Sequence, residues 1–135
     1  MDKGANMGRE MVKVKNLDVG DYVLVNEEPC QVTKKSASSA SGDESNVKVY
    51  VEGLFDSQKR TFVSDIENKR EVPIIERGSA EILAILGNNA QLMDLNSYET
   101  FELAIPLEFR GEVEEGDEIE YIQALGRKKI ERKKG

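Results

Sequence analysis

The sequence predicts a mainly β protein built from two small barrels. Short segments alternate between apolar and polar residues along most of the chain, which is the two-residue period of a half-buried strand. Turn-forming residues separate these segments at short intervals. Helical periodicity is scarce, and a short turn at 106–109 is the best helical candidate. About five short strands in each half suit two small barrels, because closure removes exposed sheet edges.

The first barrel is expected over residues 11–72, after a flexible N-terminus of residues 1–10. Turn residues at 18–21 separate the first two strands, and 27–29 form the next turn. The expected strands cover residues 11–15, 22–25, 30–33, 47–51 and 60–63.

A polar segment, 36–46, interrupts the alternation in this first barrel. It contains no apolar residue larger than alanine, so it has no face to bury. We therefore expect a projecting, mobile loop between two strands of a hairpin.

The second barrel is expected over residues 73–135. Gly87, Asn88 and Asn89 supply a hairpin turn, because glycine and asparagine tolerate positive φ, and Gly126 marks another. The expected strands cover residues 74–75, 82–86, 90–95, 100–103, 118–122 and 129–132.

Composition excludes several classes of protein. No stretch approaches the roughly 20 apolar residues of a membrane span, and residues 1–10 lack the apolar core of a secretory signal. The single cysteine, Cys30, has no partner for an internal disulfide, which fits a reducing cytoplasm. The net charge of −7 argues against long-range attraction to nucleic acid, and no DNA partner is expected.

The residues that usually carry enzymatic chemistry are missing. The chain has no histidine, which removes the commonest general base and the commonest zinc ligand. No glycine-rich loop opens a helix to hold a phosphate. The acidic run at 112–118 lacks the ligand spacing of an EF-hand, and Cys30 is best interpreted as a small buried apolar residue. We therefore expect a binding protein with no catalytic residue, metal site or cofactor.

A basic cluster near the C-terminus has two interpretations, a patch for an anionic partner or a solvated last strand. The second is favoured, because charge runs at chain ends are usually solvated. The cluster contains Arg127, Lys128, Lys129, Arg132, Lys133 and Lys134.

Five motifs, in order and at matching spacing, closely resemble the translation initiation factor 5A family, and its archaeal branch more than its eukaryotic one. The similarity extends from about Val12 to Lys133. The motifs are Glu28-Pro29-Cys30; Gly53-Leu54-Phe55-Asp56 with Gln58-Lys59-Arg60; Glu71-Val72-Pro73-Ile74-Ile75-Glu76-Arg77; Gln91 to Leu95 leading into Tyr98 to Leu103; and Glu118 to Ile122.

The resemblance implies an SH3-like barrel at 11–72 and an OB-fold at 73–135. It also implies a cytoplasmic factor that binds the ribosome during elongation, beside the peptidyl-tRNA, with tRNA and ribosomal RNA as partners and no membrane. In this family the long loop carries a lysine, in a Gly-Lys-His-Gly stretch, that is converted to hypusine. Such an extended cation is suited to contact tRNA phosphates. As for the oligomeric state, we expect a monomer or a weak dimer.

The sequence departs from the family in that loop. Alignment on Gly42 and Lys48 places Asp43 at the position of the modified lysine, and no lysine lies between Lys35 and Lys48. Glu44 then takes the place of the family's histidine. The expected ribosome- and tRNA-facing residues are Ser38, Ser39, Ala40, Ser41, Gly42, Asp43, Glu44, Ser45 and Asn46.

Three hypotheses follow from this departure. The chain is a translation factor that works without hypusine, or a divergent paralogue that occupies the same ribosomal site as an inhibitor or storage factor. The third is a non-ribosomal structural protein that reuses the barrels. Ribosome binding separates the third from the first two, and peptide-bond formation on proline-rich messages separates the first from the second.

Overall fold

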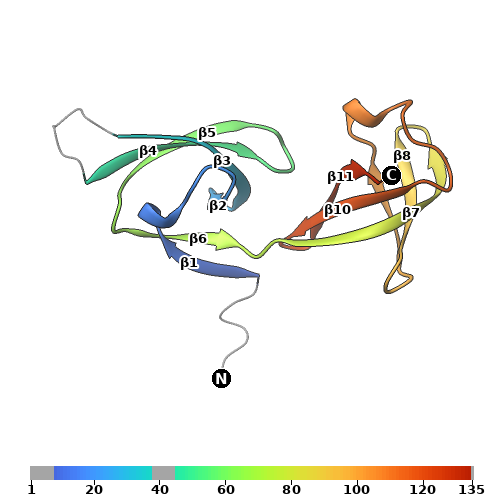
Figure 1. Ribbon diagram of the computed structural model, residues 1–135, viewed down its shortest axis with the longest axis horizontal. Helices are drawn as coiled ribbons and strands as arrows, with labels where there is room; N and C mark the ends of the chain where they lie inside the picture. Colours follow the sequence, from blue (N-terminus) through green and yellow to red (C-terminus); the bar gives the residue numbers. More distant parts are fainter. Residues whose placement is uncertain (1–7, 38–44, 135) are drawn as a thin grey trace, which may run out of the picture. The chain divides into compact units, whose positions relative to one another are not determined.

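The computed structural model describes residues 8–37 and 45–134 of the 135-residue chain. It divides into two compact units, Met1–Ile74 and Ile75–Gly135, and each is described by itself (Figure 1). None of the helices in these described ranges has the length and apolar character needed to cross a membrane.

The first unit contains two antiparallel sheets. One pairs β1 with β6, and the other has the order β2-β3-β4-β5, so neighbours along the chain are neighbours in the sheet (Figure 1). A 3-10 turn, η2 (Val14–Asn16), follows β1. The strands are β1 (Arg9–Lys13), β2 (Tyr22–Val25), β3 (Glu28–Ala37), β4 (Asn46–Gly53), β5 (Lys59–Asp65) and β6 (Lys69–Pro73).

Strict alternation in β4 builds the core of this unit. Val47, Val49 and Val51 point inward and are at most 8% exposed, while the residues between them face outward. Each buried valine contributes about 1.5–3 kcal/mol relative to an exposed one. The other buried members of this core are Val14, Leu17, Val23, Val25, Cys30, Val32 and Val72.

The second unit is one curled antiparallel sheet of order β11-β10-β7-β8-β9. Its outer strands, β9 and β11, also contact each other, so the sheet curls toward closure. The predicted turn near Pro106 is the 3-10 turn η3 (Leu107–Phe109). The strands are β7 (Glu76–Leu86), β8 (Asn89–Asp94), β9 (Thr100–Ala104), β10 (Glu118–Ala124) and β11 (Arg127–Lys133).

A separate core fills the second unit, which explains why it forms a compact body of its own. Two turns that the sequence predicted set its register: Gly87 lies between β7 and β8, and Gly126 between β10 and β11, both with positive φ. The buried members of the core are Ala80, Ile82, Ala90, Leu92, Ile105, Ile119, Tyr121 and Ile130.

The structure corrects several strand boundaries. The turn expected at 27–29 lies one residue earlier, at Asn26 and Glu27, which both have positive φ, and β3 already begins at Glu28. The strand β6 was missed, because its sequence, Lys-Arg-Glu-Val-Pro, shows almost no alternation. The short strand expected at 74–75 is absent, since these two residues lie between β6 and β7. The strand β7 begins at Glu76, six residues before the strand expected at 82–86.

Candidate functional site

The predicted loop connects β3 to β4. Both strands are longer than predicted, so Ser36 and Ala37 belong to β3 and Asn46 to β4. The last paired residues are Ala37 and Val47. Of the predicted site residues the structure describes Ser45 and Asn46, whereas residues 38–44, with Asp43 and Glu44, lie outside the described ranges.

Backbone pairing fixes the base of this loop. The carbonyl of Ser45 accepts a hydrogen bond from the Ile66 N–H at 2.7 Å. Asn46 pairs with Asp65 of β5, and the pairing continues from there along both strands. The residue that follows the loop is therefore held by the sheet and by the turn after β5.

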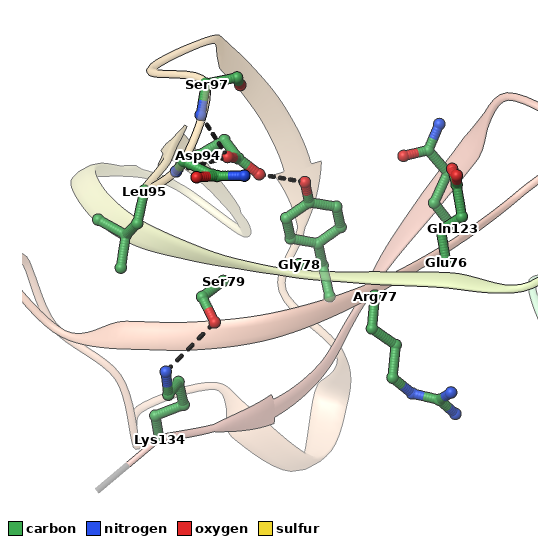
Figure 2. Close-up of a pocket in the computed structure, with 11 residues that line it drawn as sticks. Glu76, Arg77, Gly78, Ser79, Asp94, Leu95, Ser97, Gln123 and Lys134 are labelled. Atoms are coloured by element: carbon green, nitrogen blue, oxygen red, sulfur yellow. Dashed lines mark hydrogen bonds between the residues drawn. The ribbon is translucent and has the colours of Figure 1, made fainter.

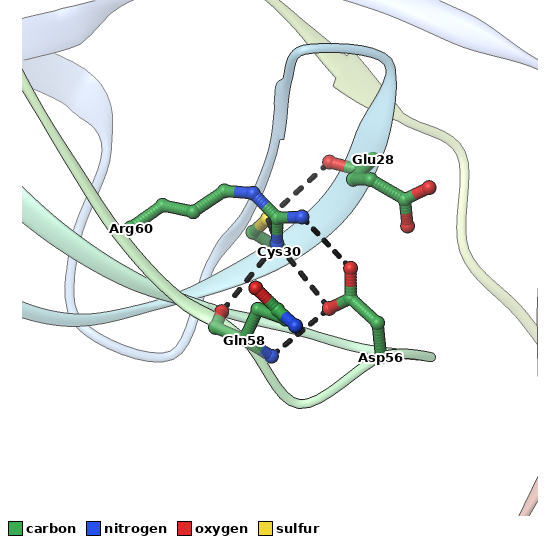
Figure 3. Close-up of polar contacts among 5 residues, drawn as sticks. All are labelled: Glu28, Cys30, Asp56, Gln58 and Arg60. Atoms are coloured by element: carbon green, nitrogen blue, oxygen red, sulfur yellow. Dashed lines mark hydrogen bonds and ion pairs between the residues drawn. The ribbon is translucent and has the colours of Figure 1, made fainter.

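A polar cluster closes the other end of the same sheet (Figure 3). Arg60 on β5 donates to Asp56 at 2.8 Å, and Asp56 also accepts the Gln58 N–H at 3.0 Å. The hydrogen bond from Arg60 lowers the pKa of Asp56 to about 2. Gly53 is required beneath this pair, because a Cβ there would lie 1.9 Å from Asp56 Oδ1. This Arg60–Asp56 clamp thus explains why Gly53, Asp56 and Arg60 occur together in the motif.

Cys30 lies under the clamp and is fully buried. Its thiol donates a hydrogen bond to the Glu28 carbonyl at 3.3 Å and lies 3.9 Å from Arg60 Nη1. Burial raises the pKa of the Cys30 thiol, and the nearby guanidinium opposes the shift only in part. A protonated, inaccessible thiol is a core residue and does not serve as a nucleophile.

The second unit carries an open polar pocket of about 870 Å³ (Figure 2). Asp94 stands at its wall, where its Oδ1 accepts the Asn96 and Ser97 N–H groups at 2.8 Å and its Oδ2 accepts the Tyr121 hydroxyl. The Tyr121 hydrogen bond and then the Ser97 N–H lower the pKa of Asp94. Through these three hydrogen bonds Asp94 holds the turn after β8 against β10.

The C-terminal basic cluster behaves as a solvated strand. Three of its side chains meet carboxylates that flank or belong to β10. Each of these ion pairs offsets one of the six positive charges of the cluster within the unit. They are Arg132 with Glu120 at 3.0 Å, Lys133 with Asp117 at 3.4 Å, and Lys134 with Glu118 at 3.9 Å.

The described ranges hold no group of three or more His, Cys, Asp or Glu side chains that could bind a metal ion. The acidic run at 112–118 lies within these ranges, and there Asp117 Oδ2 accepts the Glu114 N–H at 2.9 Å and closes a turn.

No protein-family model matches the chain. Individual relatives match nearly all of it. Translation initiation factor 5A of Methanothermobacter thermautotrophicus is 46% identical over 131 residues, which cover 96% of this chain and 100% of that protein. Translation initiation factor 5A of Archaeoglobus fulgidus is 44% identical over 126 residues, which cover 92% of this chain and 98% of that protein.

Solved structures give the same result for the fold. Eukaryotic translation initiation factor 5A from Methanococcus jannaschii superposes with a TM-score of 0.86 at 41% identity, over 94% of this chain and 96% of that one. A translation initiation factor eif-5a family protein from Naegleria fowleri, at 22% identity and a TM-score of 0.69, shares the fold. The predicted fold class, an SH3-like barrel followed by an OB-fold, is confirmed. The chain therefore belongs to the translation initiation factor 5A family, in its archaeal type.

Proposed function

We propose that this protein is a ribosome-binding translation factor that acts in peptide elongation beside the peptidyl-tRNA, in the cytoplasm and without hypusine. The observation that carries the proposal is identity of 46% to a named translation initiation factor 5A over that protein's whole length. Both barrels are retained, whereas Asp43 stands where the family's modified lysine aligns.

The loop at 38–46 faces the tRNA in this proposal, and its charge has the wrong sign for attraction. A carboxylate about 6 Å from a phosphate, at an effective dielectric constant near 20, costs on the order of 2–3 kcal/mol before salt screening. Asp43 and Glu44 both carry such a charge. Affinity for the ribosome must then come from the two barrels, and the loop contributes little to it.

Two measurements on the native protein test the proposal. Cosedimentation with ribosomes should recover the protein in the ribosomal fraction, and intact mass with peptide mapping should find no hypusine or deoxyhypusine. A spermidine-derived addition on Lys34, Lys35 or Lys48 would show that the alignment of the loop is wrong. Absence from the ribosomal fraction would favour a structural protein outside translation.

A second candidate function is supported by the acidic loop itself. A family member that occupies the ribosomal site but repels the tRNA acceptor end would act as an inhibitor or storage factor. Peptide-bond formation on a proline-rich message separates the two. A factor that supports elongation accelerates that reaction, and an inhibitor slows it.

A further inference from the structure

The outer face of the first unit's sheet presents an aromatic ring between two lysines. Tyr50 on β4 points away from the core, as the alternation of that strand requires. The Lys34 Nζ lies 5.3 Å from the centroid of its ring and the Lys48 Nζ 5.2 Å from the same centroid. Two cations thus share one half-buried aromatic platform on the outer face.

A β-bulge places Lys34 on this face. The register of β3 and β4 shifts between Val32 and Lys34, so that Val32 pairs with Val51 and Lys34 pairs with Tyr50. The extra residue, Thr33, donates its hydroxyl to the Tyr50 carbonyl at 3.2 Å. Without the bulge, Lys34 would pair one position further along β4 and its side chain would point to the core.

Neither of the two lysines is neutralised by a carboxylate of the described ranges. In residues 8–37 and 45–134, no carboxylate lies within ion-pair distance of the Lys34 or Lys48 ammonium. Lys13 and Lys15, by contrast, both contact Glu67, at 3.1 and 3.0 Å. The platform is therefore a locally positive site on a chain whose net charge is −7.

A groove of about 460 Å³ runs beside the ring and is large enough for a nucleobase and its sugar. Arg60 lines the groove but is held by Asp56, and Glu52 is the single carboxylate among the lining residues. Lys34, beside Tyr50, and Lys59, beside Glu52, also line the groove, and within the described ranges neither has an ion pair. The groove is lined by Thr33, Lys34, Tyr50, Val51, Glu52, Lys59, Arg60 and Thr61.

We propose that this face binds single-stranded RNA, with one base stacked on Tyr50 and the flanking phosphates held by Lys34 and Lys48. Stacking on an aromatic ring accepts any base, and lysines beside the ring neutralise the backbone. Stacking of a base is stronger than an exposed lysine–ring contact, so the base displaces an ammonium toward its own phosphate. An acidic peptide would use the cations and leave the ring without a role.

This site deepens the proposed function, since exposed single-stranded segments of ribosomal RNA or tRNA are ligands of this class. Its test uses free oligonucleotides, so that either proposal can fail alone. Ribosome cosedimentation without oligonucleotide binding would remove this site and leave the proposed function standing. Oligonucleotide binding without cosedimentation would do the reverse.

The chain contains no tryptophan, so Tyr50→Trp introduces a single fluorescent reporter into the platform. Oligoadenylate of about 12 nucleotides, a length in the range of single-strand sites, should quench its emission as the base stacks. The control is Tyr98→Trp, at a tyrosine of the second unit that is 70% exposed, whose emission should not change. Emission of the Tyr50→Trp variant that stays constant as oligoadenylate is raised to millimolar concentration would overturn the proposal.

Affinity measurements on the full chain test the two interactions separately. Tyr50→Ala should weaken binding of the oligonucleotide about tenfold or more, whereas Tyr50→Phe keeps the ring and should change it less than twofold. The double variant Lys34→Gln/Lys48→Gln should reduce the slope of log K against log salt by about 1.4, or 0.7 for each phosphate lost.

The matched control is Lys13→Gln/Lys15→Gln, which removes the same charge from the same unit but at lysines already paired with Glu67. Its salt slope should equal that of the unchanged protein. Equal slopes for the two double variants would overturn the phosphate contacts. A loss of affinity in Tyr50→Ala that is as large for duplex RNA as for single strands would overturn stacking, because paired bases do not reach the ring.

Discussion

The Tyr121 hydroxyl donates a hydrogen bond to the carboxylate of Asp94 within the second unit, where these side chains are 7% and 8% exposed. The other oxygen of that carboxylate accepts two backbone N–H groups of the following turn. One buried charge thus joins the end of β8 to the middle of β10.

Removing the phenol oxygen should destabilise the protein. In Tyr121→Phe the Asp94 carboxylate keeps its backbone donors but loses the Tyr121 hydroxyl, which should cost about 1–3 kcal/mol of unfolding free energy. Urea denaturation followed by circular dichroism measures the difference. Tyr98→Phe, at a 70% exposed position, is the control, and equal losses in the two variants would contradict this role.

The Tyr121–Asp94 pair also predicts that the protein loses stability at alkaline pH. Burial, and then the Asp94 carboxylate, raise the pKa of Tyr121 to about 12, above the value of about 10 in an unfolded chain. The contribution is therefore complete below pH 10 and is lost as pH rises toward 12. The stability gap between the native chain and Tyr121→Phe should be constant from pH 7 to 10 and narrow above it. A stability difference that stays constant to pH 12 would show that folding does not raise the pKa of Tyr121.

Gly78→Ala should also destabilise the second unit. A Cβ at this position would lie 2.5 Å from Tyr121 Cζ, and the ring is held by packing and by its hydrogen bond. Overpacking of this kind costs about 1–3 kcal/mol. A double-mutant cycle with Tyr121→Leu, which removes the ring, should show that the cost of Gly78→Ala falls. An unchanged cost would place the strain elsewhere.

Cys30 should resist thiol reagents in the folded protein. Its side chain is fully buried and its pKa is raised, so thiolate is scarce and inaccessible. The rate of reaction with a disulfide reagent at pH 8 should rise at least about tenfold when urea unfolds the chain. Comparable rates in native buffer and in urea would mean that the Arg60–Asp56 clamp opens readily.

Replacement of the two loop carboxylates tests whether the loop still contributes to binding. If affinity for the ribosome comes from the barrels, Asp43→Ser/Glu44→Ser should leave it unchanged or raise it slightly by relieving repulsion from RNA. Ribosome affinity at low and moderate salt, with and without tRNA in the peptidyl site, measures this. A large loss that needs no tRNA would instead indicate an acidic contact with a basic ribosomal protein.

The sequence predicted the strands whose own residues alternate between apolar and polar, and the turns that contain a glycine. The alternation around Val47, Val49 and Val51 identified β4 and its inward face, and Gly87 and Gly126 identified two turns. The strand β6 could not be found in this way, because it is held by pairing with β1, from Arg9 opposite Pro73 onward. The start of β7 likewise depends on its pairing with β10 and shows no local signal.

The candidate sites show the same limit. Cys30 was correctly interpreted as a buried residue, since a cysteine within an apolar strand usually is one. The neighbourhood of Tyr50 and Lys34 was not predicted, because a single bulge at Thr33 decides which side chain of β3 faces outward. A register shift of one residue leaves almost no trace in a sequence. The Lys48-Val49-Tyr50 alternation was the one available signal.

The strand β3 ends at Ala37 and β4 begins at Asn46, so the two strand ends form a fixed base for the segment between them. Pairing up to the Ala37–Val47 step, together with the hydrogen bond from the Ile66 N–H to the Ser45 carbonyl, holds the two strand ends in place. Doubling the length of a flexible insert costs only about 0.6 kcal/mol in closure entropy. The sequence between β3 and β4 can therefore change from cationic to acidic during evolution while the barrel that carries it stays the same. A lysine-bearing insert from a relative should be accepted by this scaffold as readily as its own.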